Sequence, residues 1–195
     1  MKKKILMIVT FLLTLATNGG QCVTSYSQGL GVPLFELGKY DYYNGKYPQV
    51  FINIDYKGTV PVFSKPDGGV LIANLRNNQK EGIYYNLFLL RKRQDKFLAA
   101  IFDASEEDLF IAYGWVDKKY LGIYLKKDYS PLLLYDEPDI NSKISELYNC
   151  NSNQVLGISD YSKKWLKVTI MIGGVLYSGW IPEDFQWPNV WTTCC

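Results

Sequence analysis

The stretch that decides the fold covers residues 172–181 and reads Ile172-Gly173-Gly174-Val175-Leu176-Tyr177-Ser178-Gly179-Trp180-Ile181. Two apolar, strand-like runs flank the pair Gly173-Gly174. Because glycine adopts positive φ at little cost, this pair predicts the two-residue turn of a β-hairpin. The second run closes on Gly179-Trp180-Ile181, and the same closure occurs earlier at Gly114-Trp115-Val116. The chain therefore contains an internal repeat.

Further matches between the two copies follow in the same order along the chain. Pro66 in the segment FSKPD corresponds to Pro138 in the segment YDEPD, and Phe97 in KFL corresponds to Trp165 in KWL. The loops are shorter in the second copy, where a glycine pair replaces the acidic segment 103–108. A shared order of strands with variable loops is typical of duplicated domains.

The pattern of side chains within each copy predicts β-structure. Apolar residues alternate at Val50, Ile52 and Ile54, which is the period of a strand, and turn residues separate the short apolar runs. No stretch shows a sustained helical stripe. We therefore predict an all-β fold, with two small, strongly bent barrels in tandem and with Trp115 and Trp180 in their cores.

Composition excludes several classes of function. The 195 residues are 48% hydrophobic, carry a formal charge of +2 and include no histidine. Three of the lysines lie at positions 2–4, in a segment that we expect to be removed, so the mature chain is near neutral and lacks the basic footprint of a nucleic-acid-binding protein. Without histidine there is no Ser-His-Asp or Cys-His pair and no His-ligated metal site. We expect no catalytic residues, metal or cofactor.

The N-terminus reads as an export signal over residues 1–21. A basic start is followed by an apolar run at 5–15 that is too short to span a bilayer comfortably, and then by small residues. This pattern predicts a periplasmic or secreted protein. Cys22 leaves a second possibility open, in which the chain is a lipoprotein and meets the membrane only through a lipid on this cysteine.

Aromatic residues outside the expected core strands are the candidate ligand-binding residues. Tyr42, Tyr43 and Tyr47 lie in an N-terminal arm at 22–47, where they form a stacking surface or pack onto the following domain. Trp165 opens a strand as a half-buried lid or a ligand shelf. Trp187 and Trp191 follow the last strand, where they clamp a ligand or cover the open end of the barrel.

Three cysteines of the second copy suggest a disulfide. Cys150 lies in a polar loop, and an exported protein usually pairs such a residue. Cys194 is the preferred partner because a terminal residue is held least well, with Cys195 as the alternative. Such a bond would tie the C-terminal tail to the second barrel.

Each copy resembles the bacterial SH3-like domain family. The family pattern has a turn with proline, here Pro138, then a strand with leucine, here 144–147, a central strand that starts at Trp165, and a Gly-Trp-Ile end at 179–181. The resemblance implies a degenerate first domain over 48–128 and a second domain with its tail over 129–195.

Members of this family commonly accompany cell-wall peptidases and amidases. The resemblance therefore implies a non-catalytic binding module of the bacterial cell envelope that recognises peptidoglycan fragments or a cell-wall partner through aromatic surface residues. The alternative is a protein–protein adaptor or inhibitor that acts through an exposed strand edge.

Overall fold

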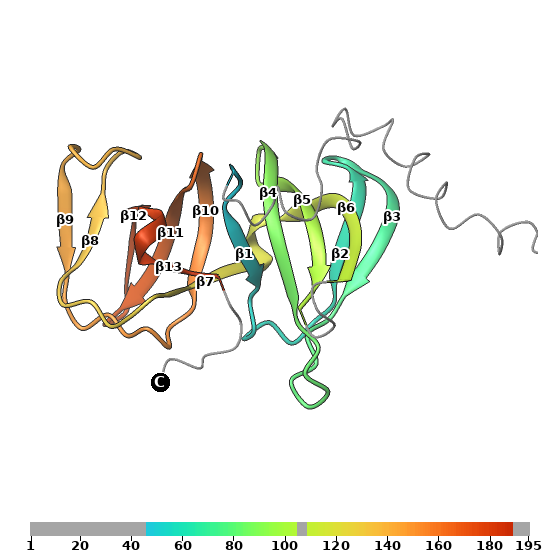
Figure 1. Ribbon diagram of the computed structural model, residues 1–195, viewed down its shortest axis with the longest axis horizontal. Helices are drawn as coiled ribbons and strands as arrows, with labels where there is room; N and C mark the ends of the chain where they lie inside the picture. The colour runs from blue at the N-terminus through green and yellow to red at the C-terminus, as the bar shows by residue number, and fades with distance from the viewer. Residues whose placement is uncertain (1–45, 105–108, 189–195) are drawn as a thin grey trace, which may run out of the picture. The chain divides into compact units, whose positions relative to one another are not determined.

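The computed structural model describes residues 46–104 and 109–188, and the chain there folds as antiparallel β-structure (Figure 1). Its strands are β1 (Gln49–Ile52), β2 (Val60–Lys65), β3 (Gly68–Leu75), β4 (Tyr85–Arg93), β5 (Lys96–Asp103), β6 (Leu109–Asp117), β7 (Leu121–Leu125), β8 (Leu132–Tyr135), β9 (Ile144–Leu147), β10 (Leu156–Ser162), β11 (Trp165–Ile172), β12 (Val175–Ile181) and β13 (Gln186–Trp187). Two 3-10 helices, η2 (Lys118–Tyr120) and η3 (Glu183–Phe185), precede β7 and β13. The all-β prediction is confirmed, and no described helix is long and apolar enough to cross a membrane.

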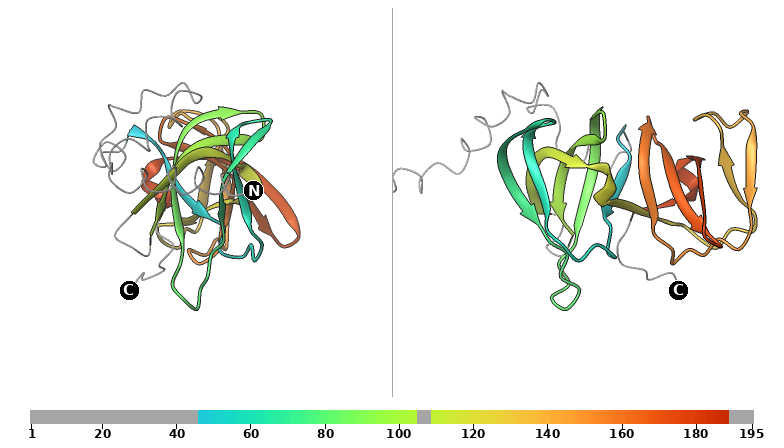
Figure 2. Two further views of the ribbon diagram at one scale, coloured as in Figure 1. Left: turned by 90° about the vertical axis from the view of Figure 1, so that its right-hand side faces the viewer. Right: turned by 180° about the vertical axis from the view of Figure 1, so that it is seen from behind.

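The strands form one continuous hydrogen-bonded sheet, where the sequence predicts two separately closed barrels. Its order is β3-β2-β6-β5-β4-β1-β7-β10-β11-β12-β8-β9, and β13 pairs with β7 off this path. Figure 1 and the right-hand view of Figure 2 show β2–β6 and β8–β12 as two curved groups. The expected pair of separate barrels is not confirmed, because β7, near the end of the expected first domain, also pairs with β10 of the second.

The order of strand pairing repeats along the chain, and β7 belongs to both copies. In the first repeat, β1 to β7, the first strand pairs with the fourth strand and with the last. In the second repeat, β7 to β13, the first strand again pairs with the fourth and with the last. β7 is therefore the last strand of one repeat and the first of the next.

The glycine–tryptophan closures occupy the same place in both repeats. Trp115 on β6 pairs with Phe63 on β2. Trp180 on β12 pairs with Tyr135 on β8. Trp180 is a core residue and is 7% exposed, as predicted. Trp115 is half-buried, so its core prediction is met only in part.

One cluster of buried side chains serves both repeats. It includes Val62, Leu75 and Phe97 of the first repeat and Leu134 and Val168 of the second. Val62, Leu134 and Val168 alternate with more exposed residues along β2, β8 and β11, as half-buried strands require. A Phe97–Tyr161 ring contact, with centroids 5.4 Å apart, adds packing between the repeats.

Several predicted features lie outside the described residues. They are the export signal at 1–21, Cys22, most of the arm at 22–47 with Tyr42 and Tyr43, and the tail residues Trp191, Cys194 and Cys195.

Candidate functional site

Two of the predicted aromatic residues, Tyr47 and Trp187, line one pocket of about 330 Å³. They are 140 positions apart in the sequence, yet both line this pocket. Its full lining is Tyr47, Pro48, Gln49, Phe88, Lys126, Lys164, Glu183, Asp184, Gln186, Trp187 and Pro188. Aromatic, proline and charged side chains thus meet at one concave surface, which is the composition expected of a ligand site.

Strand pairing brings these segments together. Trp187 on β13 is opposite Tyr124 on β7, and Gln49 on β1 is opposite Phe88 on β4. Since β1 also pairs with β7, the start of β1 and the end of the second repeat belong to neighbouring ladders. The shared strand is therefore what positions Tyr47 and Trp187.

Gln186 fixes the last short strand beneath the pocket. Its side chain is buried, and its Nε2 donates to the carbonyl oxygens of Lys164 at 2.8 Å and Ile181 at 3.2 Å. Buried amides need such partners because an unsatisfied amide is costly. These bonds tie β13 to the β10–β11 turn and to the end of β12.

Trp187 packs against a cluster of buried aromatic side chains. It packs against Phe51, Tyr84 and Tyr124, and the Phe51 and Tyr124 ring centroids are 5.0 Å apart. The indole Nε1 is buried and has no hydrogen-bond partner among the residues described. The ring is half-buried overall, so packing holds it in place while part of it faces solvent.

The charges around the pocket balance. Lys164 Nζ contacts both carboxylate oxygens of Glu183, at 2.7 and 2.8 Å. Lys126 and Asp184 add one charge of each sign, and neither has an ion-pair partner within 46–104 or 109–188. A pocket with balanced charge does not favour a polyanion, but it can meet a ligand that carries both signs.

Trp165 does not belong to this pocket. Its ring meets the edge of Tyr135, with centroids 5.3 Å apart, and the side chain is half-buried. The sequence leaves two roles open for Trp165, a half-buried lid and a ligand shelf. The contact with Tyr135 favours the lid. The structure thus joins Tyr47 and Trp187 and leaves Trp165 elsewhere.

Cys150 lies in the hydrophobic core, 4% exposed, and forms no disulfide with any of the residues that the structure describes. Its Sγ lies 3.8 Å from the carbonyl oxygen of Leu147. Desolvation by burial raises the pKa of this thiol. The predicted partners Cys194 and Cys195 lie outside the described residues, so their pairing with Cys150 stays a prediction.

Sequence reasoning missed the polar residues of the pocket, namely Gln49, Lys126, Lys164, Glu183, Asp184 and Gln186. The repeat offers a signal for Lys164 and Glu183, because the first repeat has an ion pair at the equivalent place. In the first repeat, Lys118 of η2 contacts Asp95 of the β4–β5 turn at 2.6 Å. In the second repeat, the ion pair of Glu183 and Lys164 joins η3 to the β10–β11 turn with the charges reversed.

The part of the chain that the structure describes contains no group of three or more Asp, Glu, Cys or His residues that could hold a metal ion. Comparison of the chain with protein-family models, curated proteins and solved structures finds no match.

Proposed function

We propose that this chain is an exported, non-catalytic binding protein of the bacterial cell envelope, built from two SH3-like repeats that share a strand. Its ligand is a peptidoglycan fragment or a cell-wall partner. The observation that carries the proposal is the single pocket that Tyr47 and Trp187 both line. The basic and apolar pattern of residues 1–21 supports export.

The positions of the family motifs support the SH3-like assignment. Pro138 lies in the turn between β8 and β9, Trp165 opens β11, and Trp180 closes β12 against β8. The same order of strands occurs in the first repeat. In small bent sheets of this kind, side chains fill the interior, so ligands bind at the outer faces and loops.

The chemistry of the pocket fits a muropeptide. Its aromatic and proline side chains offer apolar faces to the carbon skeleton of a sugar or peptide. Lys126 can meet a carboxylate and Asp184 can meet an amine, and a peptide attached to a sugar supplies both groups. Because the charges balance, association should depend only weakly on salt.

Titration of the purified mature protein with muropeptides, followed by tryptophan fluorescence, tests the proposal. We expect saturable binding that Tyr47→Ala weakens by about tenfold or more, since loss of a central aromatic contact commonly costs over 1 kcal/mol. Tyr148→Ala is the matched control, because Tyr148 is 55% exposed and does not line the pocket. Absence of a response at millimolar muropeptide would remove peptidoglycan as the ligand.

A protein–protein adaptor or inhibitor is the second candidate, favoured by the edge strand β3. This strand carries no charged residue, and Val70 and Leu71 are 66% and 46% exposed. Natural edges usually carry charges that prevent pairing with other strands. Pull-down from an envelope extract with wild type and Val70→Lys tests this function: a partner retained only by wild type supports it, and equal recovery contradicts it.

A further inference from the structure

A second pocket lies at the equivalent place in the first repeat. It is lined by Asn53, Asp95, Asp117, Lys118, Lys119, Leu121, Gly157, Ile158, Ser159 and Thr169, with a volume of about 490 Å³. The pocket that Tyr47 and Trp187 line is called the aromatic pocket below. In both pockets the wall combines the 3-10 helix before the last strand of a repeat, η2 or η3, with the turn of its central hairpin, β4–β5 or β10–β11. Asn53 follows β1 just as Lys126 follows β7.

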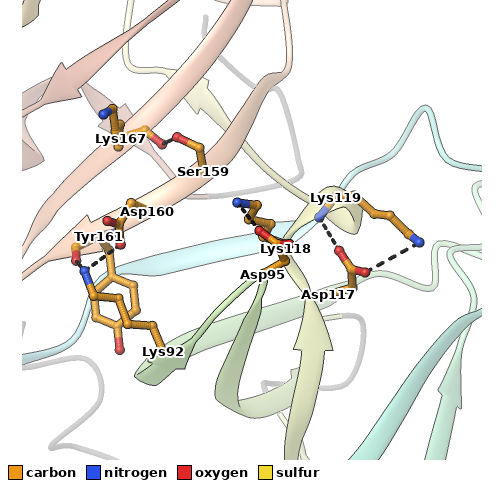
Figure 3. A network of polar contacts seen from close by, with 9 residues as sticks. All are labelled: Lys92, Asp95, Asp117, Lys118, Lys119, Ser159, Asp160, Tyr161 and Lys167. Carbon is orange, nitrogen blue, oxygen red and sulfur yellow. Dashed lines mark hydrogen bonds and ion pairs between the residues drawn. The ribbon is translucent and has the colours of Figure 1, made fainter. Parts of the chain in front are cut away.

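Hydrogen-bonding groups face this pocket without partners of their own. Among the described residues, the Thr169 hydroxyl and the Asn53 Nδ2 have no hydrogen-bond partner, while Asn53 Oδ1 accepts from the Asp55 N–H at 2.9 Å. The Ser159 hydroxyl donates to the Lys167 carbonyl at 3.1 Å, so it remains free to accept (Figure 3). Polar groups that are half-buried and unpartnered are ready to bind a ligand.

Gly157 leaves this surface open. A Cβ at position 157 would come within 2.7 Å of Thr169 Oγ1. On the opposite side, β10 pairs with β7 through Gly157 and Gly122. Gly122 is buried, whereas Gly157 is partly exposed, so the backbone of Gly157 stays accessible next to the Thr169 hydroxyl.

The lysines of this pocket are neutralised by neighbouring carboxylates. Lys118 Nζ lies 2.6 Å from Asp95, and Lys119 Nζ lies 3.5 Å from Asp117, whose other oxygen accepts from the Lys119 backbone N–H (Figure 3). An anionic ligand would have to compete with both carboxylates. The lining also lacks any aromatic side chain. A neutral ligand rich in hydroxyl groups fits these properties better than an acidic or an aromatic one.

We infer that this polar pocket, lined by Asn53, Ser159 and Thr169, is a second binding site and takes a neutral saccharide. It is independent of the aromatic pocket, since no residue lines both. Each repeat would thus bind a ligand at the equivalent position. The residues that line the two pockets differ, with aromatic side chains in one and hydroxyl and amide groups in the other.

The test is an NMR titration of the mature chain with a β-1,4-linked N-acetylglucosamine trimer. We expect saturable shifts of the backbone amides of Asn53, Gly157 and Thr169. Thr169→Val removes only a hydroxyl from a strand position, and Asn53→Asp keeps the oxygen that Asp55 uses but removes the free donor. Each should weaken binding about fivefold, as loss of one hydrogen bond predicts.

Thr59→Val is the matched control, because Thr59 is exposed and does not line the pocket. The inference is overturned if these amides do not shift, if shifts appear only around Tyr47 and Trp187, or if inorganic phosphate moves the same amides at lower concentration. Should Thr169→Val not fold, Asn53→Asp alone decides. Tyr47→Ala should leave the trimer affinity unchanged, so failure of the aromatic pocket and failure of this one are distinguishable.

Discussion

Gly179 on β12 lies against Leu134 on β8 so closely that a methyl group on the glycine would come within 2.7 Å of the Leu134 Cβ. The first repeat contains the same contact, where a Cβ on Gly114 would overlap Val62 of β2. The glycine before each tryptophan is therefore required by close approach of two strands, since both residues lie in strands with no positive φ.

Gly179→Ala should destabilise the protein by about 1–3 kcal/mol, because the added methyl group must displace Leu134 in a packed core. Urea unfolding followed by fluorescence measures this as a lower midpoint. Ser178→Ala is the control, since Ser178 is the exposed neighbour on the same strand. Equal midpoints for the two variants would contradict the close approach.

Trp180→Ala should cost more stability than Trp115→Ala. Trp180 is 7% exposed and belongs to the core, whereas Trp115 is half-buried. Truncation of a buried tryptophan typically costs about 3–5 kcal/mol. Thermal unfolding of both variants compares the two costs, and a larger effect at Trp115 would show that burial does not set their order.

Lys92 on β4 joins Asp160 on β10 across the repeats, with an Nζ–Oδ1 distance of 2.7 Å (Figure 3). Both side chains are partly exposed, so their coupling should be about 0.2–1 kcal/mol and should fall with added salt. A double-mutant cycle with Lys92→Met and Asp160→Asn measures it. A coupling that does not change between low and high salt would exclude a screened surface pair.

Alkaline pH should destabilise the fold through buried tyrosines. Burial raises the pKa of Tyr124 to about 12, above the value near 10 of an unfolded tyrosine. Because the folded state favours the neutral phenol, its contribution to stability is complete below about pH 10 and is lost as the pH rises toward 12. Unfolding free energies at pH 8 and 11 should differ less in Tyr124→Phe than in wild type, and an unchanged difference would contradict this.

The Cys150 thiol should resist alkylation in the folded protein. It is buried, and burial raises its pKa, so little thiolate forms near neutral pH. In a variant with Cys22, Cys194 and Cys195 replaced by serine, iodoacetamide should react slowly without urea and quickly with it. Rapid reaction under native conditions would place this thiol outside the core.

The sequence by itself determined the class of fold, the repeat and the hairpin turn at Gly173-Gly174, which has the positive φ that the pair predicts. These features depend on local rules, namely side-chain alternation along strands and the steric freedom of glycine. It also identified Tyr47 and Trp187 as surface aromatics, but it gave no reason to place them together.

Only the tertiary structure decided that β7 belongs to both repeats and that one sheet replaces two closed ones. Which strand pairs with which depends on contacts between distant segments, and the short apolar sequence of β7 is the same whether one neighbour or three pair with it. Both pockets follow from this pairing, since each combines residues of the two repeats across the shared strand.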